Sequence, residues 1–218
     1  MSPSLSDLLK ISSARHDHLC PRQVLGARIG MAGLAALGLD APVNKSTALV
    51  IIESDGCFAD GIEVATGATV GHRTLRVNDF GKMAATFTDV KTGRAVRISP
   101  ALDVRERALI YAPHEPRHYF AQLEGYQIMP DEELLRIQEV ALHPTLEELI
   151  SKPIVRVNCD YCGEEIINER EVVADGAVLC RTCANDGYYL ERQDQEFMNT
   201  FRDRFTLVER SSYLNHPV

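Results

Sequence analysis

The sequence lacks any apolar run near the roughly 20 residues that cross a bilayer as a helix. Its first residues also lack the basic region and apolar stretch of a secretory signal peptide. Basic residues are a minority, because 23 Lys and Arg stand against 31 Asp and Glu, a formal net charge of −8. Such a chain has no basic field to attract a phosphate backbone. We therefore expect a cytoplasmic protein whose partners include neither a membrane nor a nucleic acid.

The 218 residues suit one domain of ordinary size with a small appendage. Hydrophobic residues make up 45% of the chain and charged residues 25%, as in an average soluble globular protein. Four of the six cysteines form two Cys-x-x-Cys pairs. Without a secretory signal, this arrangement favours reduced, metal-binding thiols over disulfides.

Hydrophobic patterning predicts a core domain of mixed helices and strands over residues 1–152. The clearest element is an apolar helix over residues 21–39, with Pro21 at its first position. Other expected helices cover residues 5–11 and 58–65, expected strands cover 48–53, 74–77, 83–88 and 95–98, and helices dominate from 102 to 150. The pattern breaks at residues 151–153, so a second domain is predicted over 153–218.

Gly26, Gly30 and Gly33 fall at spacings of four and three within the predicted helix 21–39. Residues at these spacings share one helix face. A face without side chains allows a second backbone to approach closely. We therefore expect this helix to pack tightly in the interior.

The two cysteine pairs predict a zinc site. Cys159 and Cys162 form the first pair, and seventeen residues separate it from Cys180 and Cys183. This spacing is typical of four-cysteine zinc sites. Four thiolates fill a tetrahedral coordination sphere and leave no position for substrate, so one structural zinc per chain is expected.

The order of elements around these cysteines resembles a treble-clef zinc finger. Residues 165–173 and 178–179 are expected as hairpin arms that flank Asp175 and Gly176, and Cys180 to Cys183 would open a helix. Residues 187–205 are expected to be largely helical. Over residues 153–190 three Arg face seven Asp and Glu, which favours a protein partner over DNA.

A second group of ligand-type residues lies near the N-terminus. His16, His18 and Cys20 alternate, so in an extended segment their side chains project from one side. Cys20 directly precedes the predicted helix, whose N-terminus favours a thiolate. Cys57 follows the end of the predicted strand 48–53. We favour a functional metal or thiol site, although both cysteines could also be buried packing residues.

These segments resemble the FmdE family of formylmethanofuran dehydrogenase proteins over most of the first hundred residues. The similar segments are His16-Asp17-His18-Leu19-Cys20-Pro21 with Gly26, Arg28 and Gly30, then Asp55-Gly56-Cys57-Phe58-Ala59-Asp60-Gly61-Ile62, then Thr66-Gly67-Ala68-Thr69-Val70-Gly71, and Leu75 with Asp79-Phe80-Gly81-Lys82. Where the family often has a further cysteine, this sequence has Ala68. His72 lies nearby in the sequence. It could replace that cysteine as a metal ligand, and the simpler interpretation is that it is an exposed loop residue.

The resemblance implies an α+β core, a C-terminal treble-clef zinc finger and a homodimer. It also implies that His16, His18, Cys20 and Cys57 meet at a cleft that holds a metal, with Cys20, Cys57 and His18 as catalytic candidates. Mixed nitrogen and sulfur ligands suit zinc, and nickel, iron or copper are alternatives. His114 and His118 do not meet the HExxH template, because Pro116 interrupts a helix between them.

Two functions follow from these patterns. The first is a metal-binding auxiliary protein of redox or one-carbon chemistry, for which an oxidoreductase is the candidate partner. The second is a non-catalytic scaffold or regulator whose zinc finger makes protein contacts. The sequence leaves open whether the protein is an enzyme.

Overall fold

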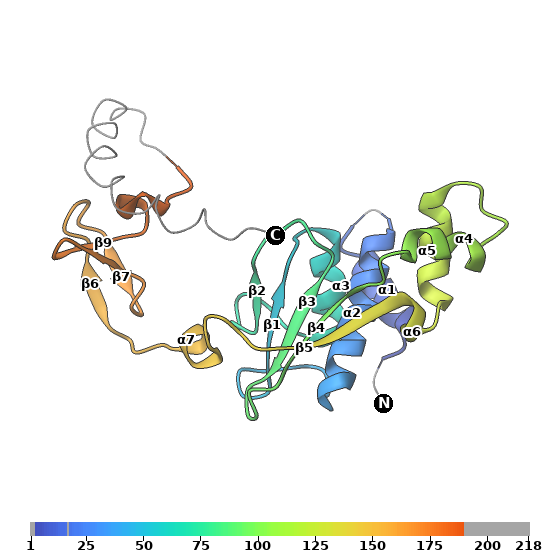
Figure 1. The fold of residues 1–218 in the computed structure, drawn as a ribbon, viewed down its shortest axis with the longest axis horizontal. Coiled ribbons are helices and arrows are strands. Elements are labelled where there is room, and N and C mark those ends of the chain that lie inside the picture. The colour runs from blue at the N-terminus through green and yellow to red at the C-terminus, as the bar shows by residue number, and fades with distance from the viewer. Residues whose placement is uncertain (1–2, 17, 190–218) are drawn as a thin grey trace, which may run out of the picture. The chain divides into compact units, whose positions relative to one another are not determined.

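The computed structural model describes residues 3–16 and 18–189 (Figure 1). Backbone contacts divide the chain into two compact units, Met1–Leu146 and Glu147–Val218. Within the described ranges, no helix has both the length and the apolar character needed to span a membrane. The part of the predicted helical tail beyond residue 189 lies outside the described residues.

The first unit packs helices against one mixed sheet. Its elements are α1 (Leu5–Ser13), α2 (Pro21–Leu37), β1 (Ala48–Ile52), α3 (Cys57–Thr66), β2 (Leu75–Val77), β3 (Ala85–Asp89), β4 (Ala95–Pro100), α4 (Val104–Tyr111), α5 (His118–Ile128), α6 (Asp131–Leu134) and β5 (Leu135–Val140). The strand order is β2-β1-β3-β4-β5. Strands β1 and β2 pair in parallel, and the other neighbours pair antiparallel. The predicted α+β fold is confirmed.

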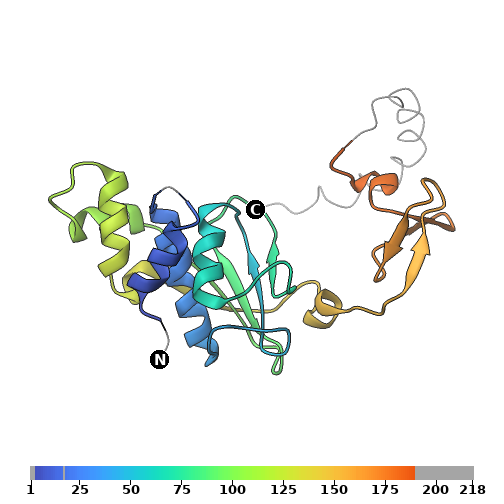
Figure 2. The ribbon, with the colours of Figure 1, turned by 180° about the vertical axis from the view of Figure 1, so that it is seen from behind.

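Helix α2 lies against the sheet and α3 packs alongside it (Figure 2). Pro21 begins α2, and Gly38 ends it in the left-handed conformation at φ 65°. The fully buried Gln23 fastens the start of this helix. Its side chain accepts the Cys20 backbone N–H at 2.8 Å and donates to the Ser12 carbonyl at 3.1 Å, which ties α1 to α2. This network sets the position of Cys20.

Glycines bring α2 and α3 into backbone contact. A Cβ added at Gly26 would lie 2.3 Å from the Phe58 carbonyl oxygen, and one added at Gly61 would lie 2.4 Å from the Gln23 carbonyl oxygen. A Cβ at Gly30 would meet Ala65 at 2.7 Å. The predicted close approach to this helix is confirmed. Its consequence is that the starts of α2 and α3, where Cys20 and Cys57 lie, are held side by side.

The prediction that helices dominate residues 102–150 is wrong over β5. The segment Asp131-Glu132-Glu133-Leu134-Leu135-Arg136-Ile137-Gln138-Glu139-Val140 has strong helix formers, but only the first four residues are helical. The rest pairs with β4, with Ile137 opposite Ile98. Helix propensity alone is a weak predictor of structure. Here the backbone N–H and C=O groups along the edge of β4 need hydrogen-bond partners, and pairing with them makes this segment a strand.

The second unit consists of short elements after α7 (Leu146–Ile150). Strands β6 (Arg156–Asn158) and β7 (Glu165–Ile167) form one hairpin, β8 (Val172–Ala174) and β9 (Ala177–Leu179) form another, and η1 (Thr182–Asp186) is a single helical turn. Asp175 and Gly176, both at positive φ, form the predicted turn between β8 and β9. The buried apolar cluster described in this unit consists of Cys159, Ile166 and Leu179.

The single hairpin arm predicted over residues 165–173 is wrong. Asn168 and Glu169 adopt positive φ values of 58° and 56°, which break the segment between β7 and β8. The two halves then join different hairpins. The helix expected to open at Cys180 begins at Thr182, and it is interrupted at Asn185, which adopts a positive φ of 66°.

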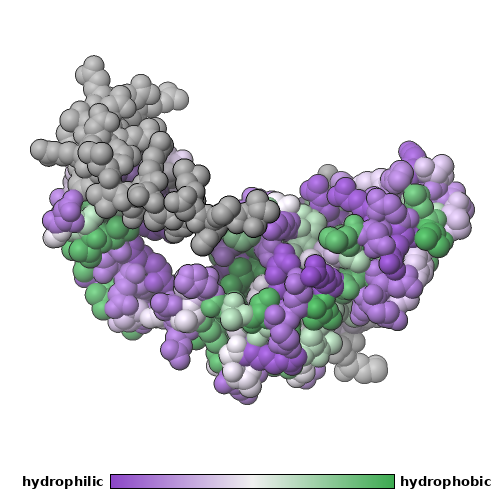
Figure 3. All heavy atoms as spheres, viewed as in Figure 1, coloured by the Kyte–Doolittle hydropathy of each residue, from purple (hydrophilic) through white to green (hydrophobic). Residues whose placement is uncertain are grey.

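Apolar side chains form separate patches on the mainly hydrophilic surface drawn in Figure 3. One patch lies at the end of the first unit that carries α4 and α5. Ile110 of α4 and Tyr119 of α5 are among the exposed apolar side chains of these helices. Tyr119 is also near the cysteines of this unit.

Candidate metal centres

The four cysteines of the second unit come together. Cys159 follows β6 and Cys180 follows β9, while Cys162 lies in the turn after β6 and Cys183 lies in η1. All four sulfur atoms lie within 4.8 Å of one another. Gly163, at φ 77°, permits the tight turn after the first pair. Residues far apart in the sequence thus supply four sulfur ligands around one point.

Backbone N–H groups in this cluster point at the sulfurs. The Cys180 N–H donates to Cys159 Sγ at 3.2 Å, and the Cys183 N–H donates to Cys180 Sγ at 3.4 Å. Donation to sulfur favours the thiolate, which is the form that binds metal. All six cysteines are free thiols. Ligand type, number and backbone donors therefore fit a closed zinc site of structural type.

The pKa values of these thiols differ. Burial acts to raise the pKa of Cys159, but backbone N–H donors from Cys162, Cys180 and Tyr161 outweigh it and lower the pKa to about 6. Burial raises the pKa of Cys183, and its hydrogen bonds with the other cysteines raise it further. Near neutral pH, Cys159 is therefore largely a thiolate while Cys183 still carries its proton.

Zinc binding to this cluster is expected to release protons. Since all four ligands must be thiolates, a Cys183 proton must leave, and the apparent zinc affinity should fall as pH is lowered from about 8 to about 6. Competition with a chromophoric chelator across this range measures the effect. A pH-independent affinity, after correction for the chelator's own protonation, would contradict the protonated state of Cys183.

The first unit brings Cys20 and Cys57 together. Cys20 caps the start of α2 and is 7% exposed, and Cys57 is the first residue of α3 and half-buried. Burial raises the pKa of the Cys57 thiol, and a side-chain hydrogen bond with Cys20 raises it further. The tight glycine contact between the two helices is the physical reason that these thiols meet.

The two histidines near Cys20 have different surroundings. His16 is half-buried, and its Nε2 contacts the Asp60 carboxylate of α3. The His18 side chain is exposed. Among the described residues, no three of His16, His18, Cys20 and Cys57 place their ligand atoms within 4.8 Å of one another. The structure thus pairs the cysteines directly, and this four-residue ligand set stays a prediction.

Two neighbours of the cysteine pair were not predicted as site residues. Asp60 lies within the motif around Cys57, three residues further along α3, and helical spacing could have identified it. Tyr119 comes from α5, about 60 residues away in sequence, and no sequence pattern indicates it. Burial raises the pKa of Tyr119, and the charges of Cys20 and Cys57 raise it further. Its phenol therefore lies near both thiols.

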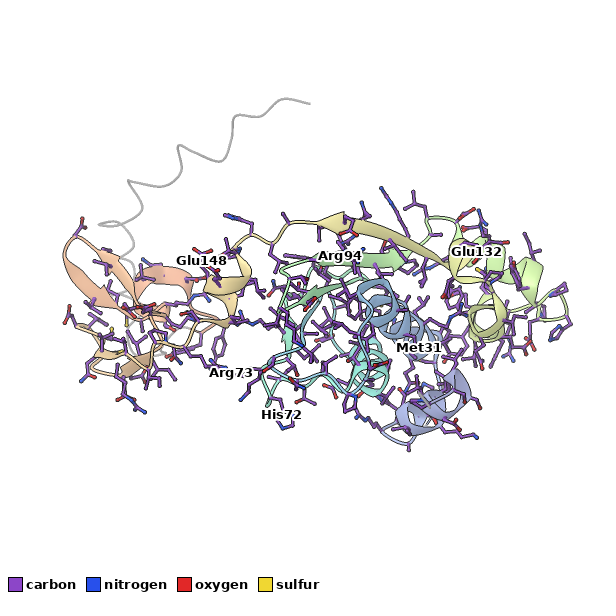
Figure 4. All side chains as sticks on the ribbon, turned by 90° about the horizontal axis from the view of Figure 1, so that it is seen from below. Met31, His72, Arg73, Arg94, Glu132 and Glu148 are labelled. Carbon is purple, nitrogen blue, oxygen red and sulfur yellow. The ribbon has the colours of Figure 1, made fainter. Side chains whose placement is uncertain are left out.

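The remaining histidine candidates lie apart from the cysteines. His72 is exposed on the loop that precedes β2, where Figure 4 shows it next to Arg73, and its Nδ1 contacts Thr69 Oγ1 at 3.0 Å. It is the exposed loop residue that the simpler interpretation expected. His114 Nε2 lies 2.9 Å from Glu124 Oε2, on the exposed side of α5. Helix α5 begins only at His118, so Pro116 does interrupt the HExxH spacing.

Comparison with known proteins finds a matching family model for each of the two units. A family model described as "FmdE, Molybdenum formylmethanofuran dehydrogenase operon" matches residues 15–153. A second model, the prokaryotic dksA/traR C4-type zinc finger, matches residues 153–189, which contain the four clustered cysteines. The predicted family and the predicted C-terminal zinc finger are confirmed.

Two individual proteins are similar to the chain. A "Probable S-adenosyl-L-methionine-binding protein" of Archaeoglobus fulgidus is 28% identical over 206 residues, which cover 84% of this chain and 54% of that protein. The chain thus spans about half the length of this curated relative. The crystal structure of a tungsten formylmethanofuran dehydrogenase FmdE-like protein from Syntrophus aciditrophicus matches with a TM-score of 0.56 and 21% identity, over 87% of this chain and 96% of that one. The second likeness shows a shared fold.

Proposed function

The chain belongs to the FmdE family and carries a four-cysteine zinc finger over residues 153–189. From this premise we propose that its first unit is a metal-binding module that serves redox or one-carbon chemistry. Cys20 and Cys57 supply two sulfur ligands, and a histidine of the segment before α2 supplies a nitrogen ligand. Such a mixed set suits zinc first, with nickel, iron or copper as alternatives. The finger serves as a structural zinc module.

The observation that carries this proposal is the meeting of two thiols at two helix starts. Free N–H groups at a helix N-terminus stabilise negative charge on sulfur. At Cys57, burial and the Cys20 thiol have the larger effect and raise the pKa, although a backbone N–H acts to lower it. Cys20 and Cys57 occupy such positions on helices that cannot move apart without breaking the glycine contacts. Two cysteines that only fill space do not need this shared geometry.

Three protein ligands leave a fourth position for substrate or water, where a bound metal supplies Lewis acidity. The residues nearby have distinct roles in this proposal. Cys20, fixed by Gln23, and Cys57 hold the site, and Tyr119 presents a hydroxyl that can donate a hydrogen bond to a group bound there. Tyr119 is partly exposed to solvent.

The name of the archaeal relative concerns S-adenosyl-L-methionine, and that ligand is carried over here only as a compound to screen. The metal proposal does not depend on it, because it rests on residues of the first unit. The homodimer and the oxidoreductase partner stay predictions.

Metal content per chain tests the proposal. Protein purified without chelator should contain two metal equivalents, and Cys20→Ser or Cys57→Ser should contain one, because loss of a sulfur ligand removes the core site and leaves the finger. Cys162→Ser is the matched control that should lose the other equivalent. Elemental analysis measures the metal equivalents per chain in the wild type and in each variant. A single zinc in the wild type that persists in Cys20→Ser would refute a metal site in the first unit.

A further inference from the structure

We propose that Asp60 is a positioning residue that holds His16 with its Nδ1 free, which makes His16, and not His18, the imidazole ligand of the Cys20 and Cys57 site. This inference rests on the proposed function.

Helix α3 places the carboxylate beside the thiols. Cys57 and Asp60 lie three residues apart, so their side chains leave the helix on one face. A group held by Asp60 is therefore held next to the cysteine pair.

The hydrogen on His16 follows from its partner. An ionised carboxylate can only accept hydrogen bonds, so Nε2, which contacts Asp60, must carry a hydrogen. In a neutral imidazole the other nitrogen, Nδ1, then has a free lone pair. Histidines that bind metals commonly donate their second ring N–H to a carboxylate, which sets the tautomer and orients the ring. His16 and Asp60 reproduce this arrangement.

Arg15 also holds Asp60 in place. Arg15 Nη1 lies 3.4 Å from Asp60 Oδ1 and 2.7 Å from Glu63 Oε2. Arg15 thus engages one oxygen of Asp60, and His16 engages the other. The Asp60 side chain is 23% exposed and that of His16 is 32% exposed, so solvent competes with this contact only in part.

His18 lacks this support. Its side chain is exposed, and no hydrogen bond or ion pair to it is found within the described part of the chain. Among the described residues, the His16 and cysteine ligand atoms do not all lie within 4.8 Å of one another, so binding requires the His16 ring to move toward the thiols. The contact with Asp60 keeps the His16 ring near Cys57 during that movement. The exposed His18 ring has no such contact, so binding a metal would have to immobilise it at an entropic cost.

The test is a Co²⁺ titration of the full chain with its finger loaded with zinc. Thiolate ligation of Co²⁺ is followed by its absorption, in competition with a chelator, and the Cys20→Ser/Cys57→Ser double variant gives the background. Asp60→Asn should weaken Co²⁺ binding by about 10–100-fold, the usual effect of removing an outer carboxylate partner. His16→Ala should weaken it at least as much, and His18→Ala should leave it within about twofold.

Glu63→Gln is the matched control, because it removes the other α3 carboxylate that binds Arg15 and leaves the His16 contact intact. It should bind Co²⁺ like the wild type. Thermal unfolding of each variant tests whether the fold is retained. Normal binding by Asp60→Asn, or loss of binding in His18→Ala, would overturn the assignment while the metal site itself stands. Absence of any Co²⁺ signal that depends on Cys20 would overturn both this inference and the proposed function.

Discussion

Removal of zinc is expected to unfold the second unit and leave the first unit folded. The buried apolar cluster described in the second unit holds only Cys159, Ile166 and Leu179, and each of the strands β6 to β9 has three residues. Domains this small rarely fold without a metal or disulfides. Structural zinc supplies about 10–16 kcal/mol of apparent binding free energy at neutral pH, which becomes folding free energy.

Amide NMR spectra recorded before and after chelation measure this effect residue by residue. Signals of β6 to β9 should collapse to the narrow range of an unfolded chain, and those of β1 to β5 should persist. Cys159→Ser should give the same result without chelator, whereas Cys57→Ser, which keeps all four finger sulfurs, should leave the β6 to β9 signals in place. Dispersed signals from β6 to β9 after complete loss of zinc would show that the hairpins fold without the metal.

Gly61→Ala is expected to destabilise the first unit by about 3 kcal/mol, a value at the upper end for overpacking. The added Cβ would lie 2.4 Å from the Gln23 carbonyl oxygen and 2.7 Å from the Ala27 nitrogen. Both are backbone atoms of α2, so no side-chain rotation can relieve the clash and the helices must separate. The loss is expected although Ala favours a helix over Gly by about 1 kcal/mol.

Urea unfolding of the first unit measures this change. Gly71→Ala is the matched control, because its Cβ would meet no atom within 4 Å and its backbone is not in the left-handed region. That variant should unfold like the wild type. Since Cys20 and Cys57 begin the two helices, Gly61→Ala should also weaken metal binding in the first unit. Wild-type stability in Gly61→Ala would mean that the helix contact is looser than the structure describes.

Elements with strong local signals could be predicted from sequence. Helix α2 is apolar on nearly all faces and has Pro21 and Gly38 at its ends, and β1 is a continuous run of β-branched and aliphatic residues. Such segments form the same structure in most contexts. Strand β5 could not be predicted, because its residues favour a helix and only its pairing with β4 makes it a strand.

The zinc finger could likewise be predicted from sequence more fully than the proposed metal site of the first unit. The spacing of Cys159, Cys162, Cys180 and Cys183 is a local pattern that indicates a common ligand cluster, and their sulfurs do lie together. For the first unit, sequence alone pointed to Cys20 and Cys57 but left the choice between His16 and His18 open. Helical spacing from Cys57 could have pointed to Asp60, but its contact with His16 is known only from the structure, and Tyr119 became a candidate only when its neighbours in space were known.

The sequence by itself determined the family, the zinc finger and the helix with a glycine face, because each depends on residue types at short, regular spacings. The tertiary structure decided that the Gly26 and Gly61 contact sets Cys20 against Cys57, and that the carboxylate of Asp60 faces His16. The physical reason is that a hydrogen bond or a thiol contact depends on a distance of a few ångströms between residues about 40 positions apart. Packing of the helices sets that distance, and no local pattern encodes it.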